Sequence, residues 1–237
     1  MTRNELESLR ARLEGAERLA IDPLGFVDRT LAPLRQEVVA FLAAGLAFGN
    51  VTAIGRSVRR VVAHLDDLET IGTVAHRWVR GADLQAVVGR LLDLQQEYGS
   101  LGALFEVGYV PGDMRRSMTN FSDRLRDGLP ATRGVVTLTT RAADGSACKR
   151  LNLFMRWVVR SEGVDLGLWR GVSPADLMMP LDVHVIRYAR RFGLTRRTTA
   201  DWKMVEEVTA HFRGLCPEDP LRYDFAISHY GMAEGWD

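Results

Sequence analysis

The stretch DGSACKRLNLFMRWVV, residues 144–159, is the part of the sequence on which our prediction of the fold depends most. It begins with a glycine turn and continues as a helix with apolar positions at Leu151, Phe154, Met155 and Val158. A turn that leads into a helix N-terminus leaves free backbone N–H groups that suit a phosphate. Lys149 falls in the first turn of this helix, where the helix dipole makes a positive charge unfavourable. Lys149 is therefore either an ordinary surface lysine or a lysine placed there for chemistry.

A second stretch, MPLDVHVIRYARRFGLTRR at residues 179–197, carries five arginines and a single acid. Asp182 follows Pro180 by two residues, so we predict that it caps a helix by accepting a backbone N–H from residue 184 or 185. Three arginines share one face of that helix: Arg187, Arg190 and Arg191. A basic run is usually a solvated face, and Asp182 is either only a cap or also a carboxylate aimed at a nucleic-acid backbone. With His184 it makes a weak metal site, because no third ligand is near.

Helical periodicity dominates the remaining sequence, and all-α is the fold class that we predict. Residues 35–48 are expected to form an apolar core helix, and Asp22 with Pro23 marks an earlier helix start. The helix at 82–98 should end at Gly99 in a left-handed cap. Further helices are expected at residues 51–67, 100–107, 112–127, 146–160, 182–192, 199–213 and 219–231. The β-branched run RGVVTLTTRAADG, residues 133–145, has no partner strand, so we interpret it as an extended connection or, alternatively, a two-strand ribbon.

The composition is that of an ordinary globular protein, with 237 residues, 46% hydrophobic, 26% charged and a net charge of +1. The first twenty residues predict an amphipathic helix and not a signal peptide, and no apolar stretch is long enough for a membrane span. Cys148 and Cys216 are too few for a disulfide framework or an iron–sulfur cluster, so we expect no metal or other cofactor. These features favour the cytoplasm, at the nucleoid if the protein is bacterial.

Together, the turn at Gly145, the residues Lys149 and Asn152 after it, and the stretch PLDVHVIRYARRFGL resemble the helix-hairpin-helix DNA glycosylase superfamily. This group includes endonuclease III and the oxoguanine glycosylases. The resemblance is strong at these two motifs and weaker at RYDFAISHYGM (222–232) and FLAAGLAFGNV (41–51), and it covers most of residues 22–232. The most similar branch is one whose members are mostly described as conserved hypothetical proteins.

The resemblance implies a single domain, residues 1–237, of two interleaved helical lobes. One lobe would span about 25–160 and end in the hairpin, and the other would combine about 1–24 with 161–237. It also implies a base-excision repair glycosylase, with AP lyase activity as a further possibility, that acts as a monomer on double-stranded DNA. A damaged base, for example an oxidised one, would be flipped into a pocket. Lys149 would attack the sugar C1′ and Asp182 would assist.

The implied DNA contacts are the hairpin and the nearby arginines, namely Gly145, Ser146, Ala147, Arg150, Arg187, Arg190 and Arg191. The sequence departs from the family pattern at Ala147, where a second glycine is usual, and in the 32 residues between Lys149 and Asp182, which include an apparent insert at 161–176. Two alternatives stay open. One is a non-catalytic helix-hairpin-helix protein that binds the backbone of DNA or RNA, and the other is a structural helical protein whose arginines meet an acidic surface.

Overall fold

The computed structural model describes residues 1–236. These residues form helices and connecting segments, and no β-strand occurs among them. The α-helices are α1 (Arg3–Leu13), α2 (Ala16–Leu19), α3 (Pro33–Gly45), α4 (Val51–Val62), α5 (Leu68–Ile71), α6 (Gly81–Tyr98), α7 (Leu101–Val107), α8 (Met114–Arg126), α9 (Arg133–Leu138), α10 (Lys149–Val159), α11 (Val183–Arg191), α12 (Trp202–Leu215) and α13 (Asp224–Ala233). Three short 3-10 helices join them: η1 (Pro23–Phe26), η2 (Ala142–Asp144) and η3 (Pro174–Asp176). The all-α prediction is confirmed.

The β-branched run at 133–145 is the clearest correction to the sequence analysis, because its first half is a helix and not an extended connection. Thr132 caps α9 by accepting a hydrogen bond from the Val135 N–H at 3.1 Å. Val135 and Leu138 are buried, and α9 packs against α6. A buried apolar face therefore outweighed the strand propensity of valine and threonine. The expected helix 51–67 also divides, since α4 ends at Val62 and Asp67 caps the separate α5.

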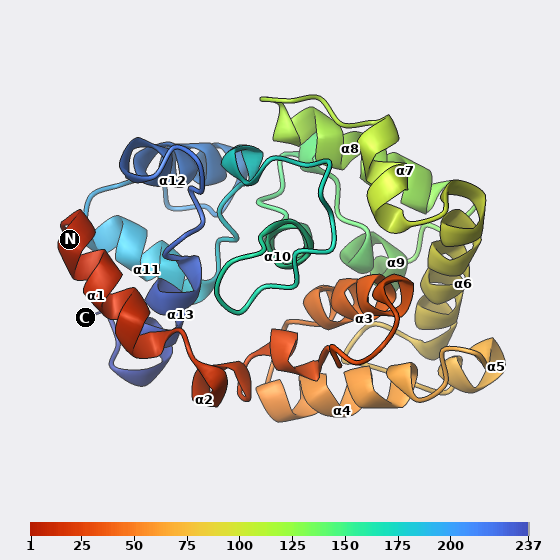
Figure 1. Cartoon of the computed structure of the whole chain (residues 1–237). Coiled ribbons are helices and arrows are strands. Elements are labelled where there is room, and N and C mark those ends of the chain that lie inside the picture. The colour runs from red at the N-terminus through yellow and green to blue at the C-terminus, as the bar shows by residue number, and fades with distance from the viewer. Residues whose placement is uncertain (237) are drawn as a thin grey trace.

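Helix α10 lies at the centre of the molecule, between the group α3 to α9 and the group α1, α11, α12 and α13 (Figure 1). It packs closely against α3, where the rings of Phe41 and Phe154 meet edge to face with centroids 5.3 Å apart. On the other side, α13 packs against both α1 and α11. The division into two interleaved lobes remains a prediction.

The long connection between α10 and α11 winds around the C-terminal end of α10 (Figure 1). The backbone N–H of Leu166 donates to the Trp157 carbonyl at 2.8 Å, and that of Trp169 donates to the Val158 carbonyl at 2.7 Å. These bonds satisfy carbonyls that every helix leaves free at its end. The connection therefore contacts the C-terminal end of α10, which is the opposite end of this helix from Lys149. Within residues 1–236, no helix is both long and apolar enough to span a membrane.

Candidate functional site

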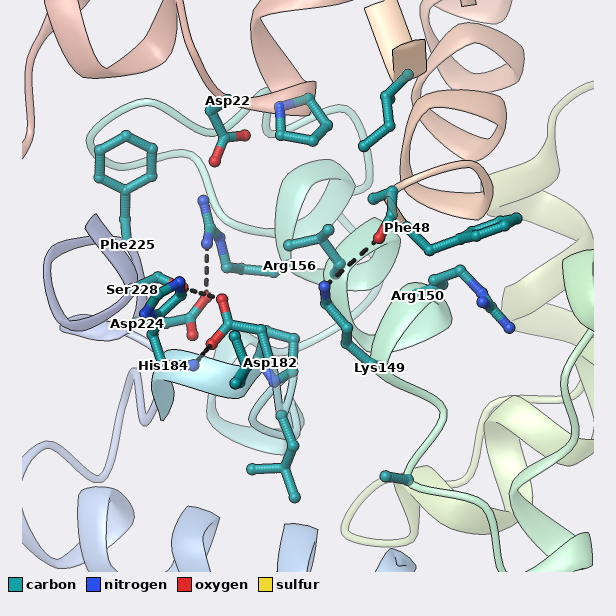
Figure 2. A pocket seen from close by; sticks show the side chains of 18 of the residues that line it. Asp22, Phe48, Lys149, Arg150, Arg156, Asp182, His184, Asp224, Phe225 and Ser228 are labelled. Atoms are coloured by element: carbon teal, nitrogen blue, oxygen red, sulfur yellow. Dashed lines mark hydrogen bonds and ion pairs between the residues drawn. The ribbon is translucent and has the colours of Figure 1, made fainter. Parts of the chain in front are cut away.

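A pocket of about 650 Å³ opens at the N-terminal ends of α10, α11 and α13. Residues 21–23 and the segment after α3 complete its wall. Figure 2 shows the side chains of Lys149 and Asp182 in this one pocket, contributed by two different helices. The structure therefore brings together the two residues that the sequence analysis predicted to be catalytic.

Lys149 is the first residue of α10, and the turn before it fixes its position. Gly145 has a left-handed φ of 79°, and its carbonyl accepts a hydrogen bond from the Trp202 N–H at 2.9 Å. Cys148 is left-handed too, with φ 45°, although it is not a glycine. The Lys149 amine lies 3.5 Å from the Ala47 carbonyl and forms no ion pair with any residue of the described chain. This weak contact leaves the amine free to reach a ligand.

Asp182 caps α11, as the sequence predicted. Its Oδ1 accepts hydrogen bonds from the backbone N–H groups of His184 at 2.8 Å and Val185 at 2.7 Å. Its Oδ2 accepts a hydrogen bond from the hydroxyl of Ser228 on α13. The carboxylate is thereby held at the open end of α11, where it lines the pocket.

The predicted hairpin residues divide between the pocket and its surroundings. Ser146, Ala147 and Arg150 line the pocket, whereas Gly145 does not. Arg150 already donates to the Thr137 carbonyl at 2.9 Å, and its guanidinium lies over the ring of Phe48. Burial lowers the pKa of Arg150 from its ordinary value.

The three arginines predicted on α11 do not line this pocket. Arg187 is exposed, one turn along the helix from Val183, which does line it. Arg190 donates to the carbonyls of Arg197 at 3.3 Å and Thr198 at 2.7 Å. Arg191 lines a different hollow, formed with α1 and the residues after α13. The structure therefore does not bring these side chains together with Lys149 and Asp182.

A buried ion pair in the pocket wall was missed by the sequence analysis. Arg156 donates from Nη1 to Asp224 Oδ2 at 2.5 Å and from Nε and Nη2 to Asp165 Oδ1 at 3.1 and 3.0 Å. Burial raises the pKa of Asp224 to about 6, the charge of Arg156 works against this rise, and the charge of Asp182 adds to it. The signal was the position of Arg156 seven residues after Lys149, which places both on one helix face.

Two further pocket residues form a second pair. His229, fully buried on α13, lies with Nε2 3.1 Å from Asp22 Oδ2. Asp22 also caps η1 by accepting from the Leu24 N–H at 2.8 Å, which confirms the predicted helix start. Among residues 1–236, no group of three or more His, Cys, Asp and Glu side chains is arranged to hold a metal ion.

Lysine usage is a further signal in the sequence itself. Lys149 and Lys203 are the only lysines of the chain, which otherwise carries arginine. Lys203 is exposed on α12 and does not line the pocket. An arginine remains protonated in proteins, whereas a lysine can lose its proton and act as a nucleophile. One of only two such amines therefore lies in the pocket.

Comparison with known proteins gives one match. No curated protein and no solved structure matches the chain. A family model described as "Protein of unknown function (DUF2400)" matches residues 22–233, which is most of the chain and contains every pocket residue named above except residue 21. The chain therefore belongs to the DUF2400 family.

Proposed function

We propose that the protein is a DNA glycosylase with AP lyase activity. The observation that supports this most is the shared pocket of Lys149 and Asp182, which lie far apart in sequence but each at the N-terminal end of a helix. An amine nucleophile and a carboxylate at one cavity are the groups that this reaction needs. The volume of about 650 Å³ is within the range of pockets that enclose small ligands, and a flipped nucleotide is a ligand of this kind.

In this mechanism the neutral amine of Lys149 attacks C1′ of the deoxyribose. The bond between C1′ and the base breaks, and its electron pair leaves with the base, which takes up a proton. The sugar ring then opens as the amine forms a Schiff base, and loss of a C2′ proton expels the 3′ phosphate. Asp182 stabilises the positive charge that develops on the sugar and accepts the proton that the attacking amine releases.

The turn before Lys149 supports a contact with a phosphate of the DNA backbone. No side chain caps α10, so its first backbone N–H groups are available to an anion at the positive end of the helix dipole. Helix α10 stabilises the turn, because the side-chain amide of Asn152 donates to the Ala147 carbonyl at 3.0 Å. Ala147, at the position where the hairpin of the glycosylase family usually has a second glycine, is buried.

Borohydride trapping tests this proposal directly. We expect the wild-type protein to form a covalent adduct with at least one duplex among those carrying oxoguanine, an oxidised pyrimidine or an abasic site. Lys149→Gln should give no adduct, because it removes the amine that forms the Schiff base. Lys203→Gln, which removes the only other lysine, is the matched control and should retain the wild-type yield. Absence of an adduct with every lesion would refute the lyase proposal and favour a non-catalytic binding protein.

A further inference from the structure

A cluster of arginines and aromatic side chains lies directly beside the pocket. Phe48 and Trp78 stack with ring centroids 4.6 Å apart. The guanidinium carbons of Arg77 and Arg133 lie 5.4 and 4.7 Å from the centre of the Trp78 ring, and that of Arg150 lies 5.2 Å from the centre of the Phe48 ring. We call these five residues the arginine–aromatic cluster. Phe48 and Arg150 also line the pocket, so the cluster continues from the pocket wall.

The cluster is assembled by the tertiary structure from four segments of the chain. Phe48 follows α3, Arg77 and Trp78 occupy the turn before α6, Arg133 begins α9, and Arg150 lies in the first turn of α10. Thr137 on α9 fixes two of them. Its hydroxyl accepts from the Trp78 indole N–H at 3.0 Å, and its carbonyl accepts from Arg150.

The charges of the cluster are not neutralised within the described chain. Among residues 1–236, no carboxylate lies within 4.0 Å of Arg77, Arg133 or Arg150, and the side chains of Arg77 and Arg133 make no hydrogen bond. Some exposed arginines elsewhere are paired with acids, as Arg12 is with Glu234 at 3.0 Å. Contacts with the Trp78 ring hold the guanidinium groups of Arg77 and Arg133 in place and leave their N–H donors free for an anion, whereas Arg150 already donates to the Thr137 carbonyl.

The backbone at Arg77 gives an independent reason to assign a role to its side chain. Arg77 has a left-handed φ of 53° in a tight turn, in which His76 and Val79 exchange backbone hydrogen bonds of 2.9 Å. Glycine or asparagine adopts this conformation more readily than arginine. An exposed arginine held in this conformation, with no acidic partner among residues 1–236, is a candidate for binding an anion.

We propose that the arginine–aromatic cluster binds the phosphate backbone of the DNA strand that enters the pocket, an inference that rests on the proposed function for the identity of that strand. Guanidinium groups form paired hydrogen bonds with phosphate oxygens. Arg77 and Arg133, which both lie over the Trp78 ring, would contact phosphates of the strand, and Arg150 continues the cluster to the pocket wall, where it is next in sequence to Lys149. Arg77, Trp78 and Arg133 are separate from the arginines of α11 and from the turn at Gly145, and Arg150 joins the cluster to that turn.

The salt dependence of DNA binding tests the inference. Fluorescence anisotropy of a labelled undamaged duplex would be measured over a salt series with the full chain. The test variant is Arg77→Asn with Arg133→Gln, because asparagine tolerates the left-handed φ of residue 77. The control variant is Arg12→Gln with Arg35→Gln. It removes the same amount of positive charge, but from exposed arginines that have acidic partners.

We expect the test variant to bind more weakly at every salt concentration, with a slope of log K against log salt smaller by about 0.9 for each lost phosphate contact. The control variant should keep the wild-type slope. An unchanged affinity and slope in the test variant, or an equal loss in the control, would overturn the inference. Thermal unfolding should show that the test variant is as stable as the wild type, since the Arg77→Asn substitution relieves the turn.

This test separates the cluster from the proposed enzyme activity. If no lesion gives a trapped adduct but the cluster variant shows a smaller slope of log K against log salt, the glycosylase proposal fails. The cluster is then still supported as a DNA-binding surface. If trapping succeeds with wild type and the cluster variant binds DNA like wild type, the inference about the cluster fails alone.

Discussion

Asp182 combines a structural role and a proposed chemical role in one side chain. Its Oδ1 accepts hydrogen bonds from two of the backbone N–H groups at the start of α11, and its Oδ2 accepts one from the hydroxyl of Ser228 at the pocket. Capping does not compete with catalysis here, because the same bonds that start the helix hold the carboxylate at the pocket.

Substitutions of Asp182 should separate these two roles. Asp182→Ala removes the cap and should lower the free energy of unfolding by about 1 kcal/mol, whereas Asp182→Asn retains an acceptor and should change it little. Both should lose most of the borohydride-trapped adduct, because neither supplies a negative charge. Urea unfolding and trapping measure the two effects.

Asp113→Ala is the matched control for the cap. Asp113 caps α8 by accepting from the Arg116 N–H at 2.9 Å and does not line the pocket. This variant should be destabilised to a similar extent but should retain full trapping. Full trapping by Asp182→Asn would show that Asp182 has no catalytic role.

At the scale of elements, Glu37 joins α3 to the start of α7 and to the long connection after α10. Its carboxylate is buried and accepts from the Gln95 amide at 2.8 Å, the Leu101 and Gly102 N–H groups at 2.9 and 3.2 Å, and the Trp169 indole at 2.6 Å. Four donors to one buried carboxylate replace its lost hydration.

Glu37→Gln should therefore be strongly destabilising. The glutamine would turn an N–H₂ group toward donors, leaving some of them buried without an acceptor, and we expect a loss of roughly 2–4 kcal/mol in the free energy of unfolding. Glu17→Gln, at an exposed position of α2, should change it by less than about 0.5 kcal/mol. Urea unfolding compares them, and equal stabilities would contradict the assigned role of Glu37.

Across the whole molecule, a network of buried charges links α10 to the connection and to α13. Arg156 bonds to Asp165 of the connection and to Asp224 of α13, and Arg160 bonds to Asp165 and to Asp219 at 2.8 Å. Removing one partner from such a network leaves a buried charge uncompensated, which is strongly unfavourable. The network thus links the apparent insert to α10 and α13, two of the helices that form the pocket.

The raised pKa of Asp224 predicts how stability depends on pH. The folded protein binds a proton at Asp224 up to a pKa of about 6, whereas the unfolded chain releases it near pH 4. The folded state holds the extra proton between these values, so this group makes the free energy of unfolding fall as pH rises from about 4 to about 6. The fall is at most about 1.4 kcal/mol per pH unit.

Urea unfolding between pH 4 and 7 measures this effect. Asp224→Asn cannot titrate and should remove the contribution, so that its stability falls less steeply with pH than that of the wild type. Asp93→Asn, at an exposed position of α6, should retain the wild-type dependence. Parallel curves for Asp224→Asn and wild type would show that Asp224 does not hold the proton.

The sequence by itself determined the helical fold class and most helix ends. The cap at Asp182, the left-handed Gly99 and the position of Lys149 at the start of α10 were all predictable, because each depends on residues a few positions apart. The same local rules predicted an extended connection where α9 forms, because they do not account for the burial of its apolar face against α6.

Only the tertiary structure decided which further groups share the pocket with Lys149 and Asp182. Asp224 lies 68 positions from Arg156 in sequence, and the arginine–aromatic cluster draws on four segments. The sequence showed charged residues at these positions but not their partners or their burial. Local hydrogen bonds and periodicity fix where a helix begins, whereas the packing of distant apolar faces fixes what lies beside it.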